Sequence, residues 1–106
     1  MVLSRQLINQ QSAEGQSGAV NLRRLGVLST SHAISWGTGV SSGAVTIEAA
    51  AREDYDGEWS PLKTVAFDGI APKQDVEILD GAYGAIRHRI STVVTDGTVT
   101  THIVGG

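Results

Sequence analysis

Apolar and polar residues alternate with a period of two along much of this chain, in short runs that end at glycine or at Asp-Gly pairs. Residues 83–94 (YGAIRHRISTVV) show the pattern most clearly, with Ile86, His88 and Ile90 on one side and charged or polar residues on the other. Because successive side chains of a strand point to opposite faces, this period predicts β-strands. Comparable runs cover residues 20–28, 32–36, 44–52, 58–67, 74–79 and 98–105.

Two local sequences qualify this pattern. Residues 48–52 (EAAAR) have high helix propensity, but we interpret 44–52 as a strand because β-branched residues lead it and a turn signal follows it. Pro61 predicts an edge strand or an interrupted ladder, since proline lacks the backbone donor.

Asp96-Gly97, between two alternating runs, predicts a tight hairpin that pairs the last two strands.

The runs together predict an all-β fold, a small antiparallel β-sandwich or jelly roll of about seven to eight strands with an extended N-terminal arm. Residues 1–18 are rich in Gln, Ser and Gly, so we expect a flexible arm there and a β-sandwich domain over 19–106. A helical turn joining Leu3 and Leu7 is the alternative for the arm. In an assembly, Leu3, Leu7 and Ile8 are the arm residues expected to lie on a neighbour.

Composition narrows the classes of protein. The 106 residues suit one domain, and aromatic residues make up only 5%, so Val, Ile, Leu and Ala must fill a thin core that association would stabilise. The net charge of −3 gives no basic face for nucleic acid. There is no cysteine for disulfides or thiolate metal sites, and no apolar run long enough for a signal peptide or a membrane span. We expect a soluble protein made in the cytoplasm, without a membrane partner.

An acidic stretch, TIEAAAREDYDGEWSPL (46–62), holds five of the eleven acidic residues. Its D-x-D-G-E segment resembles the start of a calcium loop, but the twelfth position, which needs a bidentate carboxylate, is Val65 counted from Asp54 and Phe67 counted from Asp56. Asp56-Gly57 is a turn pair between two expected strands. We therefore interpret the stretch as a solvated hairpin tip, with Trp59 as a lid on the end of the sandwich.

Other catalytic and metal motifs are weak. His88 shares the alternation of its apolar neighbours and is expected to be a core or interface histidine, while His102 lies on the opposite face to Ile103. No set of three or four zinc ligands, nucleophile elbow or complete phosphate loop is present, so we expect no metal, no cofactor and no enzymatic activity. A carboxylate pair of the glycosidase kind remains the least favoured alternative.

Two sets of side chains are candidates for binding a partner. Trp36, Tyr55 and Trp59 are the aromatic residues that would serve as stacking platforms in a carbohydrate- or receptor-binding module. Arg87 and Arg89 share one face of a strand, where they would either bind an acidic partner surface or remain solvated.

The sequences ISWGTGVSSGAVTIEAAAREDYDGEWSPLKTV and YGAIRHRISTVVTDGTVTTHIVGG resemble small structural proteins of tailed bacteriophages. The likeness covers roughly residues 34–104 and consists of a V-x-I-E strand, an acidic turn, Trp-x-x-Leu on the return strand and a late I-R-x-x-I-S strand. It implies a capsid decoration or cement protein on the virion surface, a homo-oligomer such as a trimer that binds the major capsid protein. A tail or fibre component, or a carbohydrate- or receptor-binding module, is the alternative.

Overall fold

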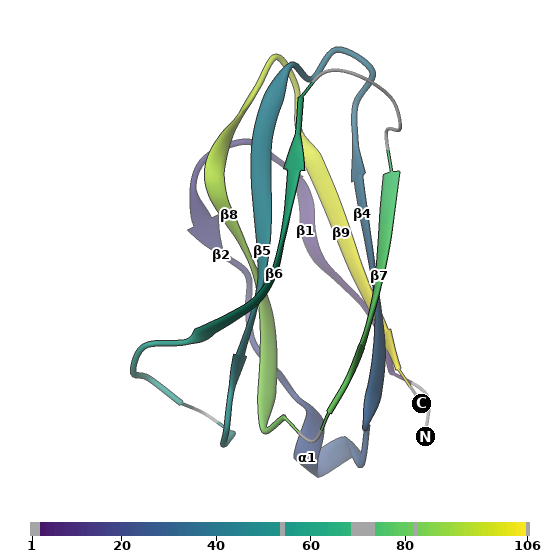
Figure 1. The fold of residues 1–106 in the computed structure, drawn as a ribbon, viewed down its shortest axis with the longest axis vertical. Helices are drawn as coiled ribbons and strands as arrows, with labels where there is room; N and C mark the ends of the chain where they lie inside the picture. Colours follow the sequence, from purple (N-terminus) through teal and green to yellow (C-terminus); the bar gives the residue numbers. More distant parts are fainter. Residues whose placement is uncertain (1–2, 54, 69–73, 82, 106) are drawn as a thin grey trace.

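Two antiparallel sheets pack face to face in the computed structural model, which describes residues 3–53, 55–68, 74–81 and 83–105 (Figure 1). Sheet A has the strand order β1-β9-β4-β7, with β1 Leu3–Gln11, β9 Val99–Gly105, β4 Ser29–Trp36 and β7 Gln74–Asp80. Sheet B has the order β2-β8-β5-β6, with β2 Gly15–Gln16, β8 Ala85–Thr95, β5 Ser42–Ala50, β6 Ser60–Phe67, and β3 Val20–Asn21 also on β8. The predicted all-β antiparallel sandwich is confirmed.

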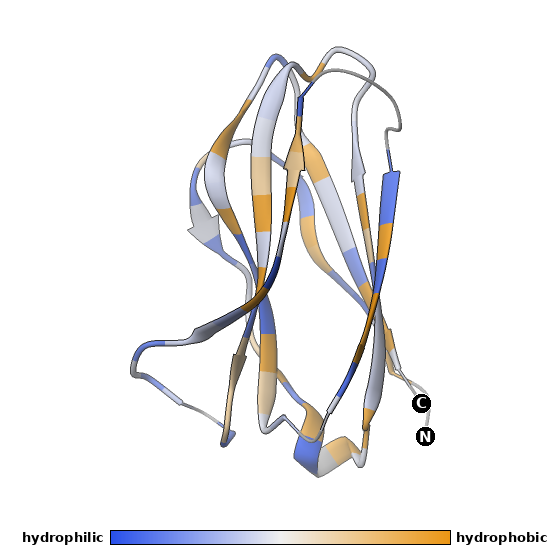
Figure 2. Ribbon diagram, viewed as in Figure 1, coloured by the Kyte–Doolittle hydropathy of each residue, from blue (hydrophilic) through white to orange (hydrophobic). Residues whose placement is uncertain are grey.

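The core fills the space between the sheets with aliphatic side chains from alternate positions of each strand. Hydrophobic and hydrophilic bands alternate along the strands in Figure 2, as the period of two requires. One aromatic pair contributes, because the rings of Trp36 and Phe67 stack across the two sheets with centroids 4.4 Å apart. The largest fully buried aliphatic residues are Leu22, Ile34, Ile47, Ile86, Ile90 and Ile103.

The N-terminal segment differs from the expected flexible arm. Residues 3–11 form β1, which pairs with β9 from Leu3 opposite Gly105 onward, and Leu3 and Ile8 are each only 4% exposed. Leu3 and Ile8 are five residues apart, which does not fit a period of two. Register shifts on either side of Ile8 rotate its side chain into the core. The polar composition concealed this strand, and the register shifts hid Ile8 from the period of two.

Two other local predictions were wrong. Residues 20–28 form the two-residue β3 and a single helical turn, α1 Leu22–Leu25, which ends at Gly26 in the left-handed conformation (φ 69°). The Asp96-Gly97 turn does not close a hairpin, because β8 already pairs with β5 on one side and with β2 and β3 on the other. The turn instead carries the chain from sheet B to sheet A.

The strand over residues 44–52 and the hairpin tip were predicted correctly. β5 runs to Ala50 in the centre of sheet B, and β6 returns beside it as an edge strand. Pro61 lies opposite Glu48, at the point where the β5–β6 register shifts. The proline thus marks an edge and an irregular ladder, as its missing N–H requires.

Candidate functional site

A pair of histidines lies in the middle of the core. His32 on β4 and His88 on β8 are fully buried, and His32 Nδ1 is 2.7 Å from His88 Nε2, so one hydrogen bond joins sheet A to sheet B. The outer ring nitrogens contact threonine hydroxyls: His32 Nε2 is 2.7 Å from Thr30 Oγ1, and His88 Nδ1 is 2.7 Å from Thr101 Oγ1. His88, expected to be a core or interface histidine, is thus a core histidine with two side-chain partners.

One direction of donation satisfies this whole chain of groups. The Thr30 hydroxyl donates to the Leu79 carbonyl at 3.5 Å, so Thr30 Oγ1 accepts from His32 Nε2. His32 Nδ1 then accepts from His88 Nε2, and His88 Nδ1 accepts from the Thr101 hydroxyl. Both rings are neutral in this arrangement, since each carries one proton, on Nε2.

Burial opposes a charge on either ring. It lowers the pKa of His32 from 6.5 to about 4. Burial and, secondarily, repulsion from His32 lower the pKa of His88 to about 3. The pair therefore stays neutral near pH 7 and holds the two sheets together by hydrogen bonds.

The outer face of sheet B carries a charged cluster that includes both predicted arginines. Glu48, whose side chain is 5% exposed, accepts hydrogen bonds from Arg87 Nε at 2.8 Å and Arg89 Nη1 at 3.4 Å. Trp59 covers the cluster, with its ring centroid 4.4 Å from Arg87 Cζ. Glu48 is thus a structural anion in β5 and not part of the solvated tip. An interface role for Arg87 and Arg89 stays a prediction.

The three predicted recognition aromatics do not form a common platform. Trp36 lies in the core, so it is unavailable for stacking on a ligand, and its indole N–H has no hydrogen-bond partner among the described residues. Tyr55 and Trp59 are half-buried with their centroids 6.4 Å apart, and Arg52 lies over the Tyr55 ring. Trp59 packs on the outer face of sheet B and does not close the end of the core as expected.

The predicted arm contacts belong to this chain's own core. Leu3 and Ile8 are buried and Leu7 packs against them from a half-buried position. Placing Leu3 and Ile8 on a neighbouring subunit was therefore wrong for the folded chain, because both already complete sheet A.

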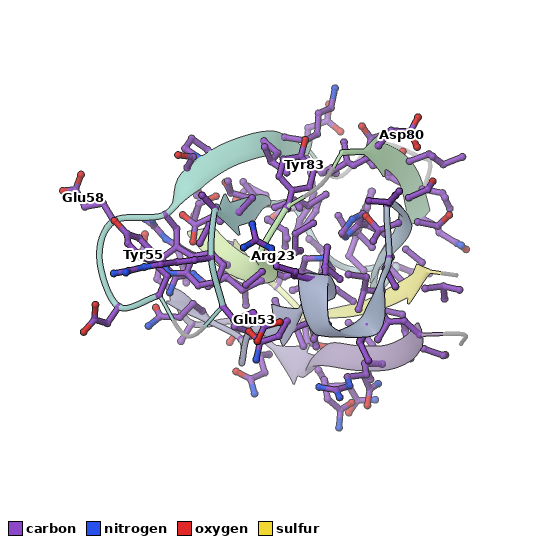
Figure 3. The ribbon with its side chains drawn as sticks, turned by 90° about the horizontal axis from the view of Figure 1, so that it is seen from below. Arg23, Glu53, Tyr55, Glu58, Asp80 and Tyr83 are labelled. Carbon is purple, nitrogen blue, oxygen red and sulfur yellow. The ribbon has the colours of Figure 1, made fainter. Side chains whose placement is uncertain are left out.

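A shallow apolar hollow lies at the end of the sandwich seen in Figure 3. Its floor is the alanine run at the end of β5, and two adjoining cavities of about 280 Å³ and about 260 Å³ share these residues and Ser60. Tyr55 and Tyr83 stand at its margins, and Arg23 holds the loop by donating to the Ala51 carbonyl at 3.1 Å. The small side chains of these alanines leave this space open.

The outer face of sheet A is almost free of charge. One row across the strands reads Ile78, Ser31, Val104, Ser4, and the next reads Val76, Ala33, His102, Gln6. Asp80, at the end of β7, is the one Asp, Glu, Lys or Arg residue at the outward positions of the described strands on this face. Ile78 is 69% exposed and Val76 is 51% exposed. This surface combines uncharged polar side chains with exposed aliphatic ones, a composition that suits contact with another protein.

The alternation in residues 74–79 predicts a strand with Val76 and Ile78 on one face, but it does not tell whether that face is the inner or the outer one. The run QDVEIL alternates acids with aliphatics, and the usual expectation would bury the aliphatics. In the structure Asp75, Glu77 and Leu79 take the inward positions, opposite Ile34, His32 and Thr30 of β4. The alternation in residues 74–79 thus predicts a strand but not its orientation. Carboxylates can face inward on β7 because this strand lies at a sheet edge.

Within the described ranges, no three histidine, cysteine or carboxylate side chains come close enough together to hold a metal ion. No helix of the described chain is long and apolar enough to cross a membrane.

Comparison with known proteins gives one structural likeness. No protein-family model matches the chain, and no curated protein matches its sequence. The fold is similar to that in the crystal structure of the SPBc2 prophage-derived protein YomS, with a TM-score of 0.73 and 11% sequence identity. The match covers 100% of this chain and 94% of that one, so the whole sandwich, including the N-terminal strand, is a fold that the two chains share.

Proposed function

We propose that this chain is a structural protein of a bacteriophage particle, and more specifically a capsid decoration or cement protein. The observation that carries the proposal is the full-length likeness of its fold to a prophage-derived protein. The quoted resemblance of residues 34–104 to small phage structural proteins points the same way. In this proposal the protein lies on the capsid surface of the virion and acts by binding, without catalysis.

The polar clusters of the molecule are consistent with this role. The histidine pair is bonded to threonines, and Glu48 is bonded to two arginines, so both clusters have structural partners within the fold. The outer face of sheet A, in contrast, presents neutral and apolar side chains to its surroundings. This face is the surface that we assign to the major capsid protein.

The size of this face favours many weak contacts. Four strands about 4.8 Å apart and about seven residues long at about 3.3 Å each give a face of about 450 Å². Two such faces bury less than the roughly 1,200 Å² of a standard stable interface. Cement proteins of this kind would therefore rely on several copies, for instance a trimer, so that linked contacts multiply a weak affinity.

The test is to add the purified chain to capsids that lack it. We expect saturable, stoichiometric binding and greater resistance of the capsids to heat. The variant Val104→Lys, in the middle of the sheet A face, should lose binding, and Val93→Lys, the same substitution at a similarly exposed position on β8 of sheet B, should retain it. Absence of saturable binding by the unmodified chain would exclude the cement role.

A tail or fibre component is the alternative within the same class. Labelled antibody against the chain, imaged on whole particles, distinguishes the two roles. Label on the head supports the cement role, and label on the tail supports the tail or fibre role instead. A carbohydrate-binding role loses its main support, since Trp36 is buried and Trp59 covers an arginine.

A further inference from the structure

β7 is the sheet edge that lacks the features protecting the other edges among the described residues. The β1 ladder shifts register twice, β2 and β3 are two residues long each, and β6 contains Pro61 beside a register shift. β7 pairs with β4 through seven consecutive residues, without a shift and without proline. Such a regular edge presents unpaired backbone groups that can accept another strand.

The side chains of β7 are sorted by face. Val76 and Ile78 point outward from sheet A, and they are exposed to 51% and 69%. Asp75 and Glu77 lie on the inward side and are half-buried. The strand carries three acids and no base, so the free edge combines an apolar outer margin with an acidic inner one.

The acidic margin is incompletely neutralised within this chain. Glu77 forms an ion pair with Lys63 of β6 at 3.5 Å. The pair joins the two sheets on the open side of the sandwich, where β6 and β7 are the edge strands (Figure 1). The Lys63 side chain is 52% exposed, which keeps this pair weak. The side chain of Asp75 has no hydrogen bond or ion pair with any described residue. A lysine or arginine of a partner could therefore pair with Asp75, and it could compete with Lys63 for Glu77.

We propose that β7 accepts an extended basic segment of a partner subunit as an added strand of sheet A. Main-chain hydrogen bonds to the β7 edge supply the attachment. Lysine or arginine at alternate positions of the segment faces Asp75 and Glu77, and the intervening apolar side chains lie beside Val76 and Ile78. The inference deepens the proposed function and rests on it for the identity of the partner, a neighbouring shell subunit.

A second copy of this chain fits the edge less well. An antiparallel pairing of two β7 strands that sets Val76 opposite Ile78 also sets Glu77 opposite Glu77, and like charges directly opposite destabilise a pair. In the next register that keeps the same faces together, Ile78 of one copy lies opposite Ile78 of the other. Val76 then lies opposite Asp80. One register thus opposes two carboxylates and the other opposes an aliphatic side chain to an acid, so a basic strand fits this edge better than a copy of β7.

The probe is a seven-residue peptide of alternating lysine and valine with capped ends, titrated into the full chain labelled with ¹⁵N. We expect amide shifts concentrated on β7 and β4, and affinity about tenfold weaker for the glutamate–valine counterpart, the order expected of two partly exposed ion pairs. Two N-methylated peptides then test strand addition. Methyls on the amides that face β7 should abolish binding, and methyls on the alternate amides should leave it unchanged.

Variants locate the site. Val76→Lys should weaken binding, and Val93→Lys, which changes the same residue type at the same 51% exposure on β8, should not. Asp75→Lys should shift the preference to the acidic peptide, and Lys63→Met should strengthen basic binding by freeing Glu77. Circular dichroism checks that each variant is folded.

Three results would overturn the inference: equal affinity for both peptides, equal effects of the two methylation patterns, or a dimer of the free chain that Val76→Lys removes and Val93→Lys keeps. The peptide experiment needs no particle, so it can fail while capsid binding succeeds, and the reverse is equally possible.

Discussion

Mild acid should destabilise this fold through the buried histidine pair. Between pH 8 and pH 5 the folded chain keeps His32 and His88 neutral, since their pKa values are about 4 and about 3. In the unfolded chain both rings have a pKa near 6.5 and become protonated. The unfolded state therefore binds more protons in this window, and stability falls as the pH falls.

The size of the loss depends mainly on the unfolded state. For each histidine, the free energy of unfolding falls by about 1.36 kcal/mol for each pH unit below 6.5. The loss is therefore about 2 kcal/mol per histidine at pH 5, and about 4 kcal/mol for the pair. The result does not depend on the folded pKa values as long as both stay below 5. A small domain with a total stability of about 5–15 kcal/mol would lose a large part of it.

Urea unfolding at pH 8, 7, 6 and 5, followed by circular dichroism, measures this loss. Near pH 5 the free energy should change by about 2.7 kcal/mol for each pH unit, the slope for an uptake of two protons. Carboxyl groups of unfolded chains titrate mainly below this window, which keeps their contribution small. The nearest carboxylate by register is Glu77, opposite His32 and paired with Lys63.

Variants separate the pair from general acid effects. His88→Gln should halve the loss between pH 8 and pH 5, whatever its effect at pH 8, because one titrating ring remains; His32→Gln serves equally if His88→Gln does not fold. His102→Gln, on the exposed outer face of β9, should keep the full loss. A loss below about 1 kcal/mol in the unmodified chain would refute the reasoning, because two rings excluded from protonation must cost more than that.

Three further changes have expected magnitudes, all measured by urea unfolding at pH 8. Glu48→Ala leaves two arginines beside a buried site without their anion and should cost about 2 kcal/mol, with Glu58→Ala, on the exposed loop, as the neutral control. Ile103→Ala should cost about 2–5 kcal/mol because its side chain is fully buried, whereas Ile78→Ala should stay within about 0.5 kcal/mol. Gly84→Ala should cost more than about 3 kcal/mol or prevent folding, because an added Cβ would clash with the Arg52 backbone.

The period of two predicts where individual strands lie, but not how the strands pair. It located β4 through β9 because each of these has one face less exposed than the other and a turn or loop at its end. It failed for β1, where the register shifts around Ile8 break the period, and for Leu22–Leu25, where two arginines separate the leucines of a single helical turn. These elements depend on contacts with distant strands, which no local pattern contains.

Pairing between strands was the harder part. Asp96-Gly97 has the composition of a hairpin turn, yet which strand accepts β9 is decided by the free edges left on β8 and β4. The same limit applies to β7. Its alternation is plain in QDVEIL, but the choice of which residues face the core follows from its place at the edge, where half-buried carboxylates still reach water.

The histidine pair shows what sequence alternation can and cannot supply. His32 shares its face with Ile34 and Trp36, and His88 shares its face with Ile86 and Ile90, so both histidines sit at inward positions of strands. A buried polar group needs a partner, and in a thin core with few other polar side chains each histidine is the natural partner of the other.

The pairing has a consequence for how the sheets align. Aliphatic side chains tolerate a sliding of one sheet over the other, whereas the chain of hydrogen bonds from Thr30 through the two rings to Thr101 is satisfied in only one alignment. Because β4 and β9 belong to sheet A and β8 belongs to sheet B, these bonds fix the relative position of the two sheets. That alignment sets the distance between β6 and β7 on the open side, and with it the Lys63–Glu77 pair. Loss of the histidine pair should therefore disturb the β7 edge as well as the core.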